Sequence, residues 1–235
     1  MTPRPAQPIG PPVDPHHAKQ PERVTLKGRW ITLAPLDAEK HADALFEGAN
    51  RGDKDRVWTY LFDGPYTDPA AFKASIAAKA QSADPLFFAI VDNATGAAVG
   101  YQTFLRIEPT HRVIEVGNIL YTPALQRTVG ATEAQYLFAR YVLDDLGYRR
   151  YEWKCNNLNA PSKRAAERFG FTFEGVFRQH MIVKGRNRDT AWFAMLDSEW
   201  PARKAAYERW LAPDNFDAAG RQRVSLSDLM PRTAP

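Results

Sequence analysis

The sequence predicts a mixed α/β domain in which about seven strands are flanked by helices. Two observations carry this prediction. Short apolar or alternating runs bounded by turn residues recur along the chain, and between them lie segments whose apolar residues recur at helical spacing. The chain has 235 residues, of which 44% are hydrophobic and 25% charged, and this suits one globular domain with a sizeable core.

The first half of the chain is predicted to contain a strand, two helices and three further strands. Asp37 has the character of a helix N-cap, and Asp68-Pro69 begins the second helix. The turn at 92–96 joins two strands of a hairpin. The expected elements are a strand at 29–33, helices at 37–49 and 68–82, and strands at 86–91, 97–106 and 113–121.

The second half alternates helices and strands. Pro123 ends the preceding strand, whereas Gly147 and Gly170 each follow the end of a helix. Apolar residues between 134 and 142 lie on one face of the first of these helices. The expected elements are helices at 131–144, 160–169 and 198–211, and strands at 149–155, 171–183 and 189–197.

Both ends of the chain are predicted to lie outside the domain, which then spans residues 22–212. Residues 1–21 are rich in proline and hold almost nothing that could be buried, so we expect a disordered tail. Residues 213–235 are expected to form a polar, loosely attached tail. The adjacent His16 and His17 on a flexible segment are expected to be solvated, and no metal site is predicted.

Charge and composition argue against several classes of protein. The net charge is +4, but no run of five basic residues occurs, so nucleic-acid binding is not expected. Cys155 is the single cysteine and cannot form an internal disulfide. No apolar stretch approaches the roughly 20 residues of a membrane span, and no secretion signal is found. We therefore expect a cytoplasmic protein without a membrane partner, and a homodimer is left open.

Three segments resemble the GNAT superfamily of acetyltransferases, and within it the branch of ribosomal-protein N-terminal acetyltransferases. The most specific segment, 159–171, is similar to the family pattern Asn-x-x-Ser-x-Arg-x-x-Glu-x-x-Gly-Phe. The resemblance implies a GNAT-type, mostly antiparallel sheet over residues 24–212, and acetyl-CoA as acetyl donor. A second segment, 123–134, is similar to the strand, loop and helix that hold the CoA diphosphate. The third segment, 175–200, is similar to the family at Gly175–Arg178, Lys184–Arg186, Asp189 and Glu199-Trp200.

The diphosphate loop departs from the family pattern Gln/Arg-x-x-Gly-x-Gly/Ala. Gln126 and Ala131 are in register, but Val129 stands at the first glycine and Gly130 follows one place late. Because valine does not easily adopt a positive φ, either the loop bends differently or this position needs no positive φ. Free helix amides and the charge of Arg127 would favour a diphosphate, and an ordinary strand-to-helix turn is the alternative.

The cofactor-binding residues follow from the resemblance. Asn159 could cap a helix instead of binding the cofactor, and Arg164 could be an ordinary surface residue. The residues expected to bind acetyl-CoA are Ile119, Tyr121, Gln126, Arg127, Thr128, Val129, Gly130, Ala131, Thr132, Asn159 and Arg164.

Two residues are candidates for the chemistry. Acetyl transfer requires a neutral amine and a proton for the departing thiolate. Glu115 is the candidate base, but eight steps separate it from Pro123 instead of the usual seven, so a bulge must turn it toward the site. A solvated strand carboxylate is the alternative. Many relatives place a tyrosine where Ala166 stands, so Ser162 becomes the candidate for a hydrogen bond to the thiol, with a helix cap as its alternative role.

The acceptor is expected to be a primary amine of a small molecule or of a peptide. Trp58, Tyr60 and Tyr101 are expected to shape its pocket, with Asn118 beside Glu115, although core packing explains part of these rings equally well. The predicted function is therefore acetyl-CoA-dependent N-acetylation by direct transfer. A non-catalytic acyl-CoA binding module is the alternative, favoured by Val129 and by the absent tyrosine.

Overall fold

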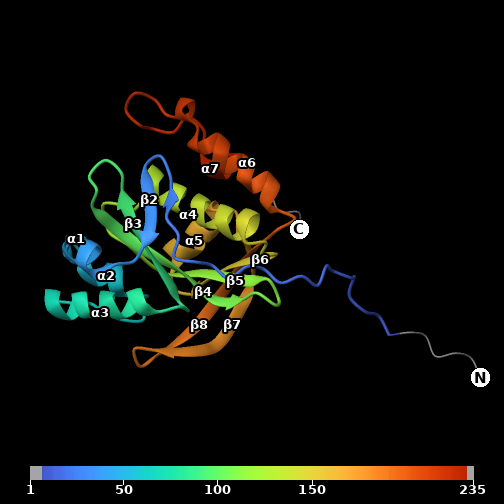
Figure 1. The fold of residues 1–235 in the computed structure, drawn as a ribbon, viewed down its shortest axis with the longest axis horizontal. Coiled ribbons are helices and arrows are strands. Elements are labelled where there is room, and N and C mark those ends of the chain that lie inside the picture. The colour runs from blue at the N-terminus through green and yellow to red at the C-terminus, as the bar shows by residue number, and fades with distance from the viewer. Residues whose placement is uncertain (1–6, 232–235) are drawn as a thin grey trace, which may run out of the picture.

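The computed structural model describes residues 7–231, except for the side chain of Lys54. Its centre is one sheet of eight strands in the order β1-β2-β3-β4-β5-β6-β8-β7 (Figure 1). The strands are β1 (Leu26–Lys27), β2 (Ile31–Pro35), β3 (Leu86–Asp92), β4 (Ala98–Glu108), β5 (Val113–Tyr121), β6 (Arg150–Asn156), β7 (Thr172–Val183) and β8 (Arg186–Leu196). The predicted mixed α/β fold is confirmed, and the two-residue β1 accounts for the difference from seven strands.

Each predicted helix is present, and two further short helices, at Lys54–Trp58 and Leu226–Leu229, were not predicted. Asp37 and Asp68 cap α1 and α3, since each side chain accepts hydrogen bonds from two backbone amides of the first turn. The chain continues from α4 into a π-helical turn at Tyr141–Asp145. The helices are α1 (Ala38–Asn50), α2 (Lys54–Trp58), α3 (Pro69–Gln81), α4 (Val129–Arg140), α5 (Ala160–Arg168), α6 (Trp200–Leu211) and α7 (Leu226–Leu229).

The helices cover the two faces of the sheet with separate cores. On one face, α1 to α3 pack on Phe87, Ala89 and Leu120. On the other face, α4 to α7 pack on Phe88 and Ile90. Neighbouring residues of β3 thus enter different cores, as the two-residue period of a strand requires. Burial of each such large apolar side chain contributes roughly 1.5 to 3 kcal/mol.

The strands β5 and β6 form the one parallel pair among the described strands, and they separate partway along their length. Their pairing runs from Val113 opposite Arg150 to Val116 opposite Trp153 and then stops. However, β5 continues to Tyr121 and β6 to Asn156. We call this region the β5–β6 split. Within the described chain, the backbone groups of β5 that face the split have no strand partner, although the Tyr121 carbonyl at the end of β5 accepts from the Gln126 side chain (2.8 Å). Backbone groups without a partner can bind another molecule.

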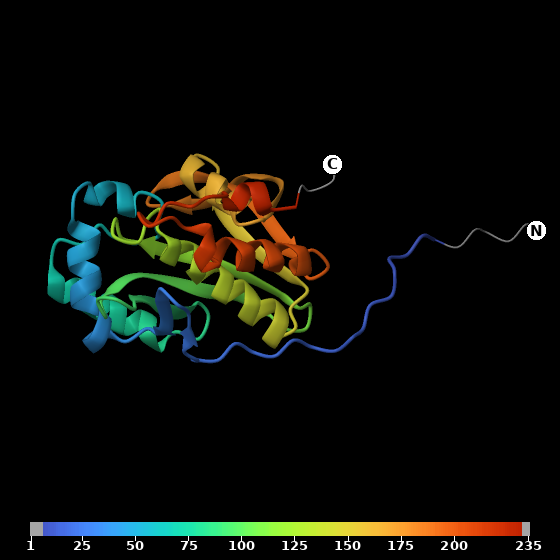
Figure 2. The same ribbon diagram turned by 90° about the horizontal axis from the view of Figure 1, so that it is seen from above.

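Parts of both terminal segments lie against the domain. The amide of Ala18 donates to the Pro109 carbonyl (3.1 Å) and that of Lys19 to the Leu146 carbonyl (3.0 Å), so this part of the expected tail runs along the domain (Figure 2). At the other end, Asn215 and Leu226 are buried. The expected loose attachment is therefore wrong for the segment around these two residues, which packs beside α6. Residues 1–6 and 232–235 of the expected tails lie outside the described residues.

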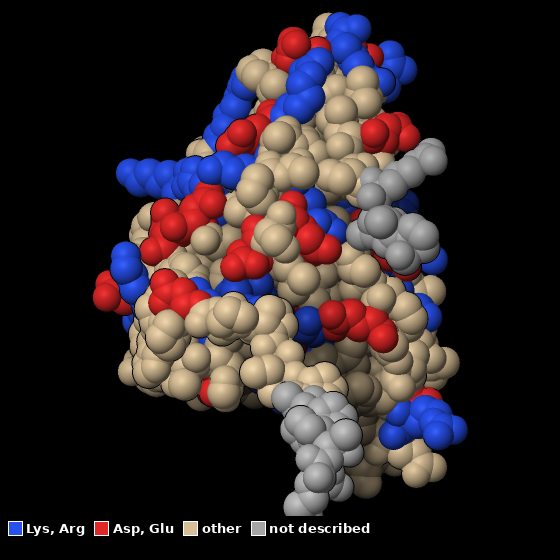
Figure 3. Space-filling view, turned by 90° about the vertical axis from the view of Figure 1, so that its right-hand side faces the viewer, with Lys and Arg blue, Asp and Glu red and all other residues tan. Residues whose placement is uncertain are grey.

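Charges on the surface are mixed. On the face in Figure 3, acidic and basic side chains are interspersed among larger uncharged areas. None of the helices within residues 7–231 is long and apolar enough to cross a membrane. The same residues contain no group of three or more potential metal-ligating side chains.

Candidate active site

A bulge in β5 determines which way Glu115 faces. Tyr101 of β4 pairs with Leu120, and Thr103 pairs with Gly117, so two steps on β4 correspond to three on β5. Asn118, inside this interval, has a φ of 46°. The extra residue confirms the bulge that the sequence predicted. It places Glu115 and Leu120 on the same face of the sheet, the face that α1 to α3 partly cover.

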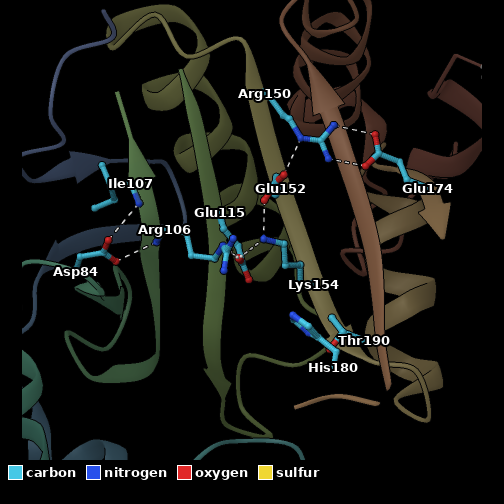
Figure 4. Close-up of polar contacts among 10 residues, drawn as sticks. All are labelled: Asp84, Arg106, Ile107, Glu115, Arg150, Glu152, Lys154, Glu174, His180 and Thr190. Atoms are coloured by element: carbon cyan, nitrogen blue, oxygen red, sulfur yellow. Dashed lines mark hydrogen bonds and ion pairs between the residues drawn. The ribbon is translucent and has the colours of Figure 1, made fainter. Parts of the chain in front are cut away.

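Glu115 belongs to a buried charge cluster on this face (Figure 4). The ammonium of Lys154, on β6, lies 2.9 Å from the Glu115 carboxylate and 2.6 Å from that of Glu152. Glu152 also pairs with the Arg150 guanidinium at 2.6 Å, and Arg106 approaches Glu115 at 3.6 Å. All five residues lie on adjacent strands, so the rigid sheet fixes their spacing.

The position of Arg106 has a local cause. Its φ is 49°, and the register of β4 against β5 shifts after Leu105. Asp84 stabilises this second bulge, because its carboxylate accepts from the amides of Arg106 (3.0 Å) and Ile107 (3.2 Å) (Figure 4). The bulge turns the Arg106 side chain toward Glu115.

The two carboxyl groups of the cluster have opposite pKa shifts. Burial raises the pKa of Glu115 above its ordinary value, and the Lys154 charge offsets part of this rise. Burial also acts to raise the pKa of Glu152, but contacts with Lys154 and Arg150 outweigh it, so this pKa is lowered. Glu115 is therefore the better proton acceptor of the two, since its pKa is closer to neutrality.

A pocket of about 240 Å³ lies beside the bulge of β5. Part of its wall is the loop between α2 and α3, residues 59–68, which we call the aromatic loop. The Tyr60 hydroxyl donates to the Leu158 carbonyl (3.1 Å), so the loop is held against the β6–α5 connection. Lys184 of the β7–β8 hairpin donates to the carbonyl of Trp58, the last residue of α2 before the loop (2.9 Å). The pocket is lined by Leu61, Phe62, Asp63, Lys79, Phe87, Tyr101 and Asn118.

Of the four residues expected to shape the acceptor pocket, Tyr101 and Asn118 line the pocket beside the bulge. Tyr60 anchors the loop instead of lining the pocket. Trp58 is 1% exposed and packs edge-on against Tyr66 and Phe72, so core packing accounts for the position of this ring, and its contact with a substrate stays a prediction.

The start of α4 fits a diphosphate. Gln126, Arg127 and Thr128 are exposed, and Thr128 caps the helix by accepting from the Ala131 amide (3.2 Å). The amides of the first helical residues have no acceptor within the helix, and the positive end of the helix dipole lies there. The donor set therefore suits the phosphate groups of CoA.

The departure at Val129 has a structural explanation. The positive φ of this loop falls on Arg127 (63°), whereas Val129 begins the helix. Gly130 is required for packing, because a Cβ there would lie 2.7 Å from the Ile31 side chain. The position of the family's first glycine thus needs no positive φ in this chain, and this settles the alternative that the sequence left open.

The remaining expected cofactor residues lie on β5, α4 and α5. Ile119 and Tyr121 lie on the part of β5 that borders the split. Thr132 is buried, and its hydroxyl accepts from Arg168 (3.0 Å). Asn159 caps α5 by accepting from the Ser162 amide (3.2 Å), and Arg164 is exposed on the same helix. Their contacts with a cofactor stay predictions.

Ser162 lies on the opposite face of the sheet from Glu115. Its hydroxyl accepts from the Trp153 indole N–H (3.0 Å), and Trp153 and Cys155 belong to the core under α4 and α5. The structure therefore does not bring the two catalytic candidates together on one face.

Lys154 and Arg106 were not identified from the sequence as members of the site. A signal was present, because charged residues occupy every second position of the central strand at Arg150, Glu152 and Lys154. On a strand between two others, such alternation indicates one polar face in the interior.

Comparison with known proteins gives the class of this protein. Residues 31–172 match the model of the family described as acetyltransferase (GNAT) domain. The chain belongs to this family, whose members are acetyltransferases that use acyl-CoA. No curated protein matches the chain.

Solved structures agree with this assignment. A GCN5-related N-acetyltransferase from Brucella melitensis is 53% identical, with a TM-score of 0.89 over 91% of this chain and 97% of that one. A probable GNAT-family acetyltransferase from Chromobacterium violaceum is 39% identical, with a TM-score of 0.75 over 84% and 100% of the two chains. The RimL acetyltransferase of ribosomal protein L7/L12, in complex with CoA, shares the fold at 20% identity, with a TM-score of 0.61 over 74% of this chain and 98% of that one.

Proposed function

We propose that this protein transfers an acetyl group from acetyl-CoA directly to a primary amine, either of a small molecule or of a peptide. The observation that carries the proposal is the position of Glu115. It is a buried carboxylate next to the point where β5 and β6 separate, on the face where the acceptor pocket lies. A fold neighbour that holds CoA supports acetyl-CoA as the donor.

Two parts of the chain would hold the donor. The free backbone groups of β5 along the split would bind the extended arm, and the exposed start of α4 would bind the diphosphate. When bound, acetyl-CoA supplies the activated acetyl thioester. The chain then has to present a neutral amine to it and to keep water out.

Glu115 would accept the proton of the acceptor ammonium. At pH 7 the loss of this proton costs about 1 kcal/mol for an α-amine with a pKa near 7.8 and about 4.6 kcal/mol for a lysine-like amine near 10.4. Burial raises the pKa of Glu115 toward that of the amine, which improves proton transfer. Lys154 limits this rise and thereby favours the ionised, proton-accepting form.

Protonation of the departing thiolate is assigned to Ser162 or to water. The Ser162 hydroxyl accepts from Trp153, and this leaves its own proton available to donate. Ala166, at the position where many relatives have a tyrosine, is buried and cannot donate.

The test is release of CoA from acetyl-CoA in the presence of a panel of amines, with a reaction lacking acceptor as control. Acceptor-dependent release, with the acetylated amine identified by mass spectrometry, is the expected result. Acetyl-CoA binding measured by calorimetry, without release for any amine of the panel, would instead support the non-catalytic binding module. Absence of binding at millimolar acetyl-CoA would contradict both functions.

A further inference from the structure

Arg188 is a buried cation without an anionic partner. This residue of β8 is 8% exposed, and its Nε has no hydrogen-bond acceptor. Among residues 7–231, no carboxylate lies within ion-pair distance of it. Buried Arg203 differs, since it pairs with Glu199 at 3.2 Å and donates to the Gly170 carbonyl. Because a buried charge normally has a partner, the environment of Arg188 is incomplete.

Arg188 lies at the edge of the proposed acceptor site. Arg188, Thr190 and Trp192 share one face of β8, and the Lys154 ammonium is 3.7 Å from the centre of the Trp192 ring. Thr190 pairs with Asn156, the last residue of β6, so Arg188 stands just beyond the end of that strand, where the split is open.

The aromatic loop connects Arg188 to the pocket. The guanidinium carbon lies 5.3 Å from the centre of the Phe62 ring, and Phe62 lines the pocket. A ring at this distance attracts the cation and holds it in place. The guanidinium therefore has a fixed position between the pocket wall and the β5–β6 split.

The carboxylates nearby are already paired. Glu115 and Glu152 contact Lys154, and Asp63 in the pocket wall pairs with Lys79 at 2.5 Å. Asp189, next to Arg188 in the chain, accepts from the Gln179 amide (2.8 Å). The chain thus supplies anions for its other buried cations here and none for Arg188.

We propose that Arg188 binds a carboxylate of the acceptor, so that the acceptor is an amine that also carries a carboxylate group. The inference rests on the proposed function and names its substrate class. A guanidinium presents paired N–H donors that match the two oxygens of a carboxylate. Phe62 supports the guanidinium, and the Nε–H without an acceptor shows that the hydrogen-bonding capacity of this group is not satisfied within the described chain.

The test uses pairs of amines that differ only by carboxylate and carboxamide. One pair is γ-aminobutyrate and its amide, and the other is the amidated peptides Ser-Glu-Ala and Ser-Gln-Ala. Binding to the protein–CoA complex is measured by calorimetry, and kcat/KM by CoA release from acetyl-CoA. The wild type should prefer the carboxylate member of at least one pair by roughly tenfold or more, as expected for a charged hydrogen bond. A preference within the γ-aminobutyrate pair indicates a small-molecule acceptor, and a preference within the peptide pair indicates a peptide acceptor.

The variant Arg188→Met should abolish this preference, mainly through KM, while acetyl-CoA binding stays unchanged. Arg186→Met is the matched control, since Arg186 is exposed on the same strand, and it should keep the preference. Arg188→Lys should retain part of it, because the charge remains but the paired donors are lost. This second variant keeps the test valid if the methionine variant does not fold.

The outcomes separate this inference from the proposed function. Transfer to amines with equal preference for both members of each pair would overturn the role of Arg188 and leave the function intact. A carboxylate preference in binding that Arg188→Met removes, without any transfer, would support the site and contradict the function. No binding of either carboxylate probe, or a preference that survives in Arg188→Met, would overturn the inference.

Discussion

The Lys154 ammonium lies 2.9 Å from the Glu115 carboxylate across the parallel pair of β5 and β6. Both side chains are almost fully buried, so the contact is screened little by water. Glu115 lies in the part of β5 that pairs with β6, and Lys154 directly follows Trp153, the last residue of β6 that pairs with β5. The charge of Lys154 therefore controls the protonation of the proposed base.

Replacement of Lys154 by Met should affect both activity and stability. The positive charge lowers the pKa of Glu115, so its removal raises that pKa further, and the acid limb of the pH–rate profile should move to higher pH. Two buried carboxylates would also lose a partner, which should cost about 3 to 5 kcal/mol of unfolding free energy. Kinetics across pH and urea unfolding measure the two effects. An unmoved acid limb would contradict the coupling.

The two carboxylates of the cluster should influence stability with opposite sign. The pKa of Glu152 is lowered in the folded state, so its contribution is present above the ordinary value of 4.5 and is lost as pH falls through the lower folded pKa. The pKa of Glu115 is raised, so ionisation opposes folding as pH rises from 4.5 through the folded pKa.

The free energy of unfolding at pH 7 minus that at about pH 3.5 should therefore be smaller in Glu152→Gln than in the wild type, and larger in Glu115→Gln. Urea unfolding of both variants at each pH measures this difference. If this free-energy difference changed in the same direction in both variants, the opposite pKa shifts of Glu115 and Glu152 would be contradicted.

Glu133 should be a major determinant of stability outside the site. Its buried carboxylate accepts from the amides of Arg29, Trp30 and Ile31 at 2.7 to 2.9 Å, and so ties α4 to the turn before β2. A glutamine offers one acceptor oxygen and opposes the other donors with N–H groups, so Glu133→Gln should lose roughly 2 to 4 kcal/mol of unfolding free energy. Glu167→Gln, at an exposed position on α5, is the control and should change stability little.

The expected contact of Arg127 with the CoA diphosphate is tested by the variant Arg127→Asn. Asparagine is chosen because it tolerates the positive φ of this position. If Arg127 contacts the diphosphate, the variant should bind CoA more weakly by roughly tenfold or more, as expected for a lost charged hydrogen bond, and bind pantetheine unchanged. Titration calorimetry with both ligands measures this. Equal weakening for the two ligands would place Arg127 away from the phosphates.

Local signals in the sequence were sufficient to predict most of the fold. Helix caps such as Asp37 and Asp68 and the apolar run of β3 depend on neighbouring residues, and each was found as expected. The bulge in β5 was the condition under which the spacing of Glu115 from Pro123 would let Glu115 face the site, and it is present. The short helix α2 was not predicted, since its five residues lack helical periodicity.

The site depends on contacts between residues that are far apart in the sequence, and the sequence did not reveal these contacts. The contact of Lys154 with Glu115 needs the pairing of β5 with β6, and the place of Arg188 needs β8 to lie beside β6. The same holds for the C-terminal segment around Asn215 and Leu226, which is polar in composition but contributes buried residues. Trp58 was assigned to the pocket because composition does not distinguish a core ring from a lining one.

Glu115 is proposed to accept the proton of the acceptor amine. Turnover of Glu115→Gln, with acetyl-CoA and the best amine of the panel, is measured together with acetyl-CoA affinity to test this role. Glu108→Gln, an exposed carboxylate on β4, is the control. Turnover should fall by about 10²-fold or more, while acetyl-CoA affinity and the control stay at wild-type values. Wild-type turnover in Glu115→Gln across the pH range would contradict the account.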